Sequence, residues 1–212
     1  MLPNQIIICT KEEAGVSYQQ IVNLMHESFQ ERLDQGLHYS CSFMTEDQFR
    51  QKTRNGIVFV AIDNITGTLV GTNTLNVLND DGKKYGYMEY VAVKSSYKHS
   101  GVGAQILHNL RRKALDANCS YILSDTSTKA TSAVQYHLKN GFKIIGLESY
   151  RSTNYWSYVF RMQLVPSLIW NNSVFLKIHY WCSFVFIRLT RNIDGSDRWI
   201  GKLYKKLIKC KN

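Results

Sequence analysis

Glu89 is the residue whose type and setting most directly suggest chemistry. It lies in residues 87–93, a short run of β-branched and aromatic residues that predicts a strand. Side-chain alternation along this strand places Glu89 on one face with Val91 and Val93. A carboxylate in a partly buried cleft can take a proton from an amine, directly or through a water molecule, and so act as a general base. The alternative is a strand-edge glutamate that pairs with a lysine.

A polar connection and the start of a helix follow this strand. Residues 94–100 include Lys98, His99 and Ser100, and the helix then opens on four small or apolar residues: Gly101, Val102, Gly103 and Ala104. The first N–H groups of a helix have no partner within it, and the helix dipole adds partial positive charge there. Two glycines would let a phosphate approach the main chain, with Lys98 and His99 at the rim. The pattern indicates an anion site, and a plain helix cap is the alternative.

This strand, loop and helix resemble the GNAT superfamily of acyl-CoA-dependent N-acyltransferases. The signature of that superfamily is Gln or Arg, two residues, Gly, one residue, and then Gly or Ala, directly after a strand. Lys98, Gly101 and Gly103 stand at these positions, and the lysine is a departure from the signature. The resemblance covers roughly residues 5–165.

A later stretch, residues 133–142, resembles a second motif of the same superfamily. The expected alanine, glycine and phenylalanine are present, but His137 stands where the superfamily has a tyrosine, and Tyr136 precedes it. The resemblance implies that a side chain here donates a proton or a hydrogen bond to the departing thiolate. His137 could do so as an imidazolium, and Tyr136 could do so through its hydroxyl. The alternative is that His137 is only a surface helix residue.

The resemblance also implies acetyl-CoA as the acyl donor and no metal. It gives Glu89 the role of general base for an amine that attacks the thioester directly. Strand amides near Val91 and Val93 would pair with the pantetheine arm and polarise the acyl carbonyl. The implied cofactor-binding residues are Val91, Ala92, Val93, Lys98, His99, Ser100, Gly101, Val102, Gly103 and Ala104.

We therefore interpret the chain as an N-acetyltransferase that transfers an acetyl or other acyl group from acetyl-CoA to a primary amine of a small molecule or sugar. A second interpretation is a catalytically impaired acyl-CoA-binding protein or a membrane-associated interaction protein, because residues 98 and 137 depart from the pattern of the superfamily. The sequence leaves open the acceptor amine, the acyl chain length and the use of an acyl carrier protein as donor.

The remaining patterns predict the elements that hold these residues. Residues 5–9 predict a strand, and two helices follow with Ser17 and Thr45 as N-caps. Further strands are expected at residues 57–62, 69–77, 121–124, 142–147 and 156–164. With helices after Gly101 and over residues 131–138, this order is typical of an α/β (α+β) fold. We expect a mixed central sheet of about seven strands flanked by helices.

Composition gives the setting of this fold. A length of 212 residues favours one acetyltransferase domain, residues 1–165, and a helical extension, residues 166–212. Five scattered cysteines indicate reduced thiols in a cytoplasmic protein and argue against a disulfide scaffold or a zinc site. The first residues do not read as a signal peptide, because no basic residue precedes the apolar run at residues 6–8.

The extension carries most of the positive charge. Residues 166–212 hold nine Lys or Arg and two Asp, a net charge of +7 out of +10 for the chain. Residues 174–187 are apolar but too short and too polar for a transmembrane helix. Residues 198–209 predict a basic amphipathic helix that associates peripherally with the inner face of an anionic membrane or with an acidic protein. The alternative is packing on the catalytic domain or in a homodimer, and nucleic acid is the least favoured partner.

Overall fold

The computed structural model describes residues 5–151, 153–202 and 205. Its contacts divide the chain into two compact units. The first unit contains Met1–Gln35 and Tyr39–Ser124, and the second contains Gly36–His38 and Asp125–Asn212. The expected division of the chain between residues 165 and 166 stays a prediction.

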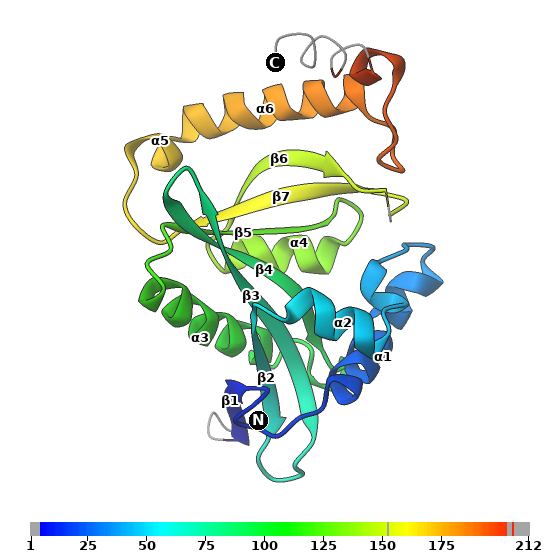
Figure 1. Ribbon diagram of the computed structural model, residues 1–212, viewed down its shortest axis with the longest axis vertical. Coiled ribbons are helices and arrows are strands. Elements are labelled where there is room, and N and C mark those ends of the chain that lie inside the picture. Colours follow the sequence, from blue (N-terminus) through cyan, green and yellow to red (C-terminus); the bar gives the residue numbers. More distant parts are fainter. Residues whose placement is uncertain (1–4, 152, 203–204, 206–212) are drawn as a thin grey trace. The chain divides into compact units, whose positions relative to one another are not determined.

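The first unit contains most of the sheet and three α-helices (Figure 1). Its strands are β1 (Ile6–Thr10), β2 (Ile57–Asp63), β3 (Leu69–Asp80), β4 (Lys83–Val93) and the first half of β5 (Tyr121–Ser127). Its α-helices are α1 (Tyr18–Asp34), α2 (Glu46–Thr53) and α3 (Val102–Asp116). Two short 3₁₀-helices, η2 (Ser40–Ser42) and η3 (Ser95–Tyr97), lie in the connections. Strands β1 to β4 pair antiparallel in sequence order, and β4 pairs with β5 in parallel.

The second unit contains the end of β5 and the rest of the chain. Its elements are α4 (Thr131–Lys139), β6 (Lys143–Ser149), β7 (Trp156–Gln163), α5 (Leu168–Asn171) and α6 (Ser173–Thr190). Strands β6 and β7 form an antiparallel pair. The strand order is β1-β2-β3-β4-β5-β7-β6, so the predicted mixed α/β sheet of about seven strands is confirmed.

Local signals explain where several helices begin. Ser17 forms a capping box with Gln20 at the start of α1, and Thr45 forms another with Gln48 at the start of α2. After its capping box, α1 buries an apolar stripe that includes Ile21, Leu24 and Met25. Both predicted N-caps are confirmed. They could be predicted because the side chains that bond to the first backbone N–H groups of each helix lie within three residues of one another in the sequence.

A tight hairpin joins β3 to β4 and fixes their register. Asp81 and Gly82 have φ values of 46° and 77°, as a two-residue turn with positive φ at both positions requires. Pairing runs from Asp80↔Lys83 to Thr74↔Glu89, after which β3 advances two residues while β4 advances three. The extra residue on β4 makes a β-bulge, so strict alternation from Glu89 to Val93 does not hold.

Helix α6 packs on β6 within the second unit. The Leu147 backbone N–H donates to Ser183 Oγ at 3.1 Å, and His179 Nδ1 donates to the Ile145 carbonyl at 2.6 Å. A Cβ on Gly146 would lie 2.7 Å from Ser183 Oγ, so the glycine permits this close approach. Within the described part of the chain, no helix is both long enough and apolar enough to span a bilayer.

The predicted helix over residues 198–209 lies partly outside the described residues, which exclude 203, 204 and 206–209. Residues 199–202 and 205 are helical. Trp199 is exposed, and Lys205 Nζ forms a salt bridge with Asp197 at 2.6 Å.

Candidate functional site

The carboxylate of Glu89 is held by an amide on the neighbouring strand. Asn76 Nδ2 on β3 donates a hydrogen bond to Glu89 Oε2 on β4 at 2.6 Å. Both side chains are half-buried. A Cβ on Gly56 would collide with Asn76 Oδ1 and lie 3.1 Å from Thr74 Cγ2, so the absence of a side chain at residue 56 leaves room for Asn76.

Tyr90, the next residue of β4, lies in the bulge. Its φ is 56°, a left-handed conformation that is uncommon for a bulky residue and adds backbone strain. Its ring meets the fully buried ring of Phe49 on α2 edge to face, with centroids 5.3 Å apart. Such aromatic pairs contribute about 0.5–1.5 kcal/mol beyond area burial. Helix α2 therefore helps to hold the bulge that follows Glu89.

The end of β4 has different surroundings on its two edges. On one edge, Val93 pairs with Gly71 and the Lys94 N–H donates to the Val70 carbonyl at 2.8 Å. On the other edge, the ladder to β5 consists of Gly86↔Ile122 and Tyr87↔Leu123 among the described residues. The ladder stops before Val91, Ala92 and Val93, the segment to which the sequence assigns the pantetheine arm. Ala92 is buried, and Val91 and Val93 are half-buried.

The loop between β4 and α3 brings the predicted phosphate-binding residues together. His99 and Gly101 both have positive φ, 64° and 88°, and Gly101 is the N-cap of α3. No heavy atom lies within 4 Å of an ideal Cβ at Gly101. The first turn of α3 contains Val102 and Ala104, whose N–H groups are not used by the i to i−4 bonds of the helix, and Gly103 lies between them. The backbone thus forms an open cradle that fits a phosphate.

Close packing positions the start of α3 against the sheet. A Cβ on Gly71 would lie 2.8 Å from Ile106 Cδ1 and 3.0 Å from Val102 Cγ1. Because residue 71 is glycine, α3 can bury Val102 and Ile106 against β3. The cradle is therefore built on a rigid element.

Tyr97 ties the loop to the end of β2. Its hydroxyl donates to Asp63 Oδ2 at 2.6 Å, and Asp63 Oδ1 accepts from the N–H groups of Ile65 and Thr66 at 2.9 and 3.2 Å. The hydrogen bond from Tyr97, followed by these backbone donors, lowers the pKa of Asp63. The same hydrogen bond raises the pKa of Tyr97, so the phenol stays protonated as the donor.

The lysine of the signature forms an ion pair with helix α1. Lys98 Nζ lies 2.7 Å from Glu31 Oε2, and the neighbouring Lys94 Nζ lies 3.9 Å from Glu27 Oε2. The Lys98 hydrogen bond, followed by its positive charge, lowers the pKa of Glu31. These pairs are partly exposed, and such pairs typically contribute less than about 1 kcal/mol to stability. Their effect is to hold the loop lysines beside α1.

In the second unit, the structure buries His137 in the aromatic core. Its ring stacks on Phe160 with centroids 4.4 Å apart, and Nδ1 lies 2.7 Å from the Ala133 carbonyl oxygen. Burial, partly offset by this hydrogen bond, lowers the pKa of His137 to about 4. At neutral pH the ring is uncharged; because Nδ1 carries the proton donated to the carbonyl, Nε2 is an acceptor. His137 is therefore not the surface helix residue of the alternative interpretation, and its neutral ring is poorly suited to act as an imidazolium donor.

Tyr136 has the chemistry that His137 lacks. It is half-buried on α4, and burial raises the pKa of its phenol, so the hydroxyl keeps its proton at neutral pH. It meets the His137 ring edge to face at 5.5 Å. A protonated phenol can donate to a thiolate.

Sequence reasoning missed three residues that position these groups. Asn76 lies on β3 and Gly56 lies just before β2, whereas Glu89 lies on β4. Only the pairing register of β3 and β4 brings Asn76 beside Glu89. Asp63 lies in a turn-rich segment, where an aspartate is expected to serve the turn alone. Among the described residues, no three His, Cys, Asp or Glu side chains gather into a metal-binding group.

Comparisons with known proteins identify the family of the chain. The sequence profile of the acetyltransferase (GNAT) family matches residues 18–142. No curated protein matches the chain.

Several solved structures share the fold. A GNAT-family acetyltransferase of Staphylococcus aureus Mu50 has 17% identity, covers 75% of this chain and 99% of its own, and gives a TM-score of 0.58. A GNAT-family acetyltransferase from Elizabethkingia anophelis with acetyl-CoA bound has 15% identity, 76% and 99% coverage and a TM-score of 0.56. An aminoglycoside 6′-N-acetyltransferase complexed with coenzyme A has 14% identity, 76% and 98% coverage and a TM-score of 0.57. Because the profile match spans more than half of the sequence, the chain belongs to the GNAT acetyltransferase family.

Proposed function

We propose that this protein transfers an acetyl group from acetyl-CoA to a primary amine of a small-molecule or sugar acceptor. The observation that carries the proposal is the Glu89 carboxylate, held by Asn76 at 2.6 Å on the strand that leads into the glycine-containing loop. A base and an anion cradle on one continuous segment are what direct acetyl transfer to an amine requires.

Glu89 acts as the general base in this proposal. The attacking amine must lose a proton, and Glu89 accepts it directly or through a water molecule. The Asn76 amide donates to Glu89 Oε2 and so fixes the orientation of the carboxylate.

The backbone of residues 98–104 holds the phosphates of the acyl donor. Positive φ at His99 and Gly101 turns the chain into the first turn of α3, whose N–H groups point out of the helix start. Strand β4 offers backbone groups at Val91, Ala92 and Val93 beyond the end of its ladder to β5. Acetyl-CoA, when bound, supplies an activated thioester carbonyl.

In the second unit, we assign the proton donor for the departing thiolate to Tyr136. Burial keeps its phenol protonated, whereas the His137 ring is neutral and already donates to Ala133. A thiolate is a good leaving group, so this donor contributes less than the base.

The acceptor is best sought among amines of differing size and charge. One protein of similar fold is an aminoglycoside 6′-N-acetyltransferase, so amino sugars head the panel. Full-length protein is incubated with acetyl-CoA and each amine, and free thiol and acetylated product are measured by absorbance and mass spectrometry. Thiol release that depends on both an amine and Glu89 supports the proposal.

The alternative, an acyl-CoA-binding protein without turnover, predicts a different result. It would bind CoA in calorimetry and release no amine-dependent thiol with any member of the panel. That outcome would overturn the enzymatic proposal while leaving the CoA cradle in place. Association through residues 198–209 and homodimer formation stay predictions that this assay does not address.

A further inference from the structure

Helix α6 has apolar side chains on two opposite faces. On one face, Leu176 and Ile187 are buried, and His179 and Ser183 bond to β6. On the other, large side chains recur at helical spacing and stay exposed: Val174, Ile178, Trp181 and Leu189, here called the α6 stripe. Ile178 and Trp181 are 58% and 65% exposed. An apolar stripe of this size on a helix that is already packed calls for a second apolar environment.

The preceding turn of helix also carries exposed apolar side chains. Leu168 and Ile169 on α5 are exposed, Leu168 at 95%. Only Asn172 separates α5 from α6, and its side chain caps α6 by accepting from the N–H groups of Val174 and Phe175. The exposed apolar residues are therefore part of ordered helices.

The charge of the same region is of one sign. Residues 149–193 contain no Asp or Glu. On α6 the charged side chains, Lys177 and Arg188, are both exposed and basic, and the Arg188 guanidinium lies 5.4 Å from the Phe184 ring centroid. At 100° per residue, both charged side chains lie along one edge of the apolar stripe.

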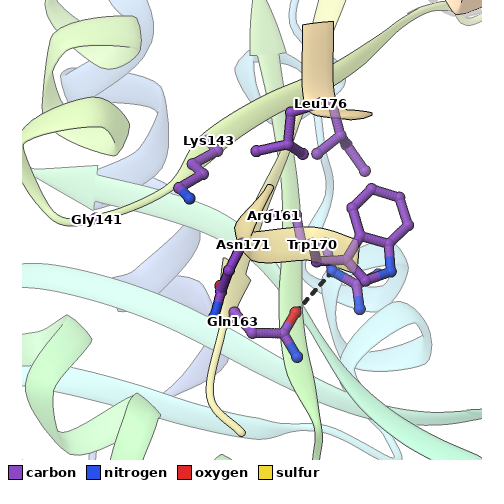
Figure 2. Close-up of a pocket in the computed structure, with 8 residues that line it drawn as sticks. Gly141, Lys143, Arg161, Gln163, Trp170, Asn171 and Leu176 are labelled. Atoms are coloured by element: carbon purple, nitrogen blue, oxygen red, sulfur yellow. Dashed lines mark hydrogen bonds between the residues drawn. The ribbon is translucent and has the colours of Figure 1, made fainter. Parts of the chain in front are cut away.

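Two more cations line a cavity of about 170 Å³ beside α5, and Figure 2 shows their side chains. Lys143 and Arg161 come from facing positions on β6 and β7, and the Arg161 guanidinium lies 4.1 Å from the Trp170 ring centroid. Arg161 Nε donates to Gln163 Oε1 at 3.1 Å. The lining contains no acidic residue. The α5 end of the surface is therefore also positive.

We propose that the surface formed by the α6 stripe, Leu168 and Ile169 docks on an anionic phospholipid membrane. Apolar side chains with a tryptophan, flanked only by cations, suit the boundary between headgroups and acyl chains. A second copy docked through the same surface would place Lys177 and Arg188 near the like charges of its partner, with no acidic residue on α6 to neutralise them. Charge complementarity therefore favours anionic lipid.

This location differs from the basic segment at residues 198–209. Lys205 in that segment is paired with Asp197, whereas Lys177 and Arg188 flank the apolar side chains directly. The α6 stripe is thus the primary contact in this proposal. It is also independent of the acetyl-transfer chemistry, since no residue of the stripe is assigned a catalytic role.

Vesicle flotation of the full-length protein tests the proposal. We expect it to float with vesicles of phosphatidylglycerol and phosphatidylcholine, to float far less with phosphatidylcholine alone, and to dissociate from anionic vesicles as salt rises. The double variant Lys177→Gln, Arg188→Gln should lower the partition coefficient about 30-fold at low salt, roughly fivefold per basic residue. Ile178→Glu with Trp181→Glu should lower it at least about tenfold.

Matched controls separate docking from misfolding. Ile65→Glu replaces a 77% exposed isoleucine in the β2–β3 turn, and Lys52→Gln with Lys139→Gln removes two exposed cations elsewhere. These variants should float like the parent protein, and all variants should keep the parent circular dichroism spectrum and melting temperature. Equal flotation of the α6 variants and the parent would overturn the proposal. A second result would also overturn it: the parent protein does not float, sedimentation shows a dimer, and Trp181→Glu dissociates that dimer. This result would assign the surface to a second copy of the chain.

Discussion

Asn76 on β3 donates a hydrogen bond to Glu89 on β4 from a diagonal position across the two strands. Asn76 stands directly opposite Tyr87, and Glu89 lies two residues further along β4, yet Nδ2 and Oε2 are 2.6 Å apart. Diagonal neighbours on one face are within reach of side chains of this length. The orientation of the proposed base therefore depends on the pairing register of two strands.

Replacement of Glu89 by glutamine should abolish most turnover and leave CoA binding intact. The substituted amide keeps an oxygen that can accept from Asn76 but cannot take a proton at neutral pH. We expect kcat to fall by about 10²–10⁴. Steady-state kinetics with the best acceptor measure the fall, and calorimetry with CoA checks that the dissociation constant changes little. A variant with parental rates across the pH range would exclude Glu89 as the base.

Asn76→Ala should lower kcat about tenfold without changing CoA affinity. A hydrogen bond to a charged group contributes about 1.5–3 kcal/mol, and its loss lets the carboxylate leave its position. Asn76→Asp should move the acidic limb of the pH–rate profile to higher pH, because a second carboxylate disfavours ionisation of Glu89. Asn79→Ala, at an exposed position of the same strand, is the matched control and should match the parent.

Gly56→Ala should reproduce part of the Asn76→Ala effect from outside the site. The added Cβ would collide with Asn76 Oδ1 and displace the amide. In the double variant Gly56→Ala, Asn76→Ala, the loss of kcat should be smaller than the two single losses combined, since both act through one contact. Fully additive losses of kcat would show that Gly56 acts by another route.

Gly103→Val should weaken CoA binding at least about tenfold by placing a branched side chain in the cradle. Residue 103 is preferable to residue 101 for this test, because the φ of 88° at Gly101 would strain any other residue. His108→Val, at an exposed position of α3, introduces the same residue in the same helix without approaching the cradle. Calorimetry should show parental affinity for this control, and equal affinity of the Gly103 variant would contradict the assignment of the loop.

Tyr136→Phe should lower kcat modestly and most strongly for acceptors whose attack is fast, because loss of the thiolate is then limiting. His137→Phe should keep turnover, since the ring packs on Phe160 and is uncharged at neutral pH. Parallel kinetics of the two variants decide between the residues. A large loss of kcat in a folded His137→Phe variant, with parental rates in Tyr136→Phe, would reverse the assignment.

The stability of the protein should depend on the protonation of His137. Its pKa falls from 6.5 to about 4 on burial, so the folded state disfavours the proton that the unfolded chain accepts. The contribution of the neutral His137 ring to the free energy of unfolding is fully present above pH 6.5. This contribution, about 3 kcal/mol, is lost as the pH falls toward 4. Urea unfolding at several pH values measures this loss. His137→Phe should show a smaller decrease over the same interval, and an identical decrease would exclude His137 as its source.

Short-range signals allowed much of the fold to be predicted. The caps at Ser17 and Thr45 were readable because each acts within three residues, and the start of α3 was readable because Gly101 stands where a left-handed residue is needed. The helical extension was predicted only in outline. The lone apolar run at residues 174–187 did not reveal that α6 has a packed face and an exposed face.

The bulge at Tyr90 and the contact between Asn76 and Glu89 could not be predicted in the same way. A period of two assumes that every residue of a strand is paired, and one extra residue on β4 breaks that assumption without any glycine to signal it. The burial of His137 was missed for a related reason. The motif predicts only which residue type stands at position 137. The burial of the His137 ring depends on contacts with Phe142 and Phe160, which come from later parts of the chain.

The two-residue turn at Asp81 and Gly82 sets the register of the β3–β4 ladder as far as the bulge. Every pair from Asp80↔Lys83 to Thr74↔Glu89 keeps the same sum of residue numbers, so the turn alone determines which residue meets Glu89. Insertion of one residue at this exposed turn would require a new bulge or would shift β4 by one position, turning the Glu89 side chain to the opposite face. Closing such a short loop costs little entropy, so the hairpin can form early in folding. The register of the proposed base would then be set before the distant parts of the chain assemble.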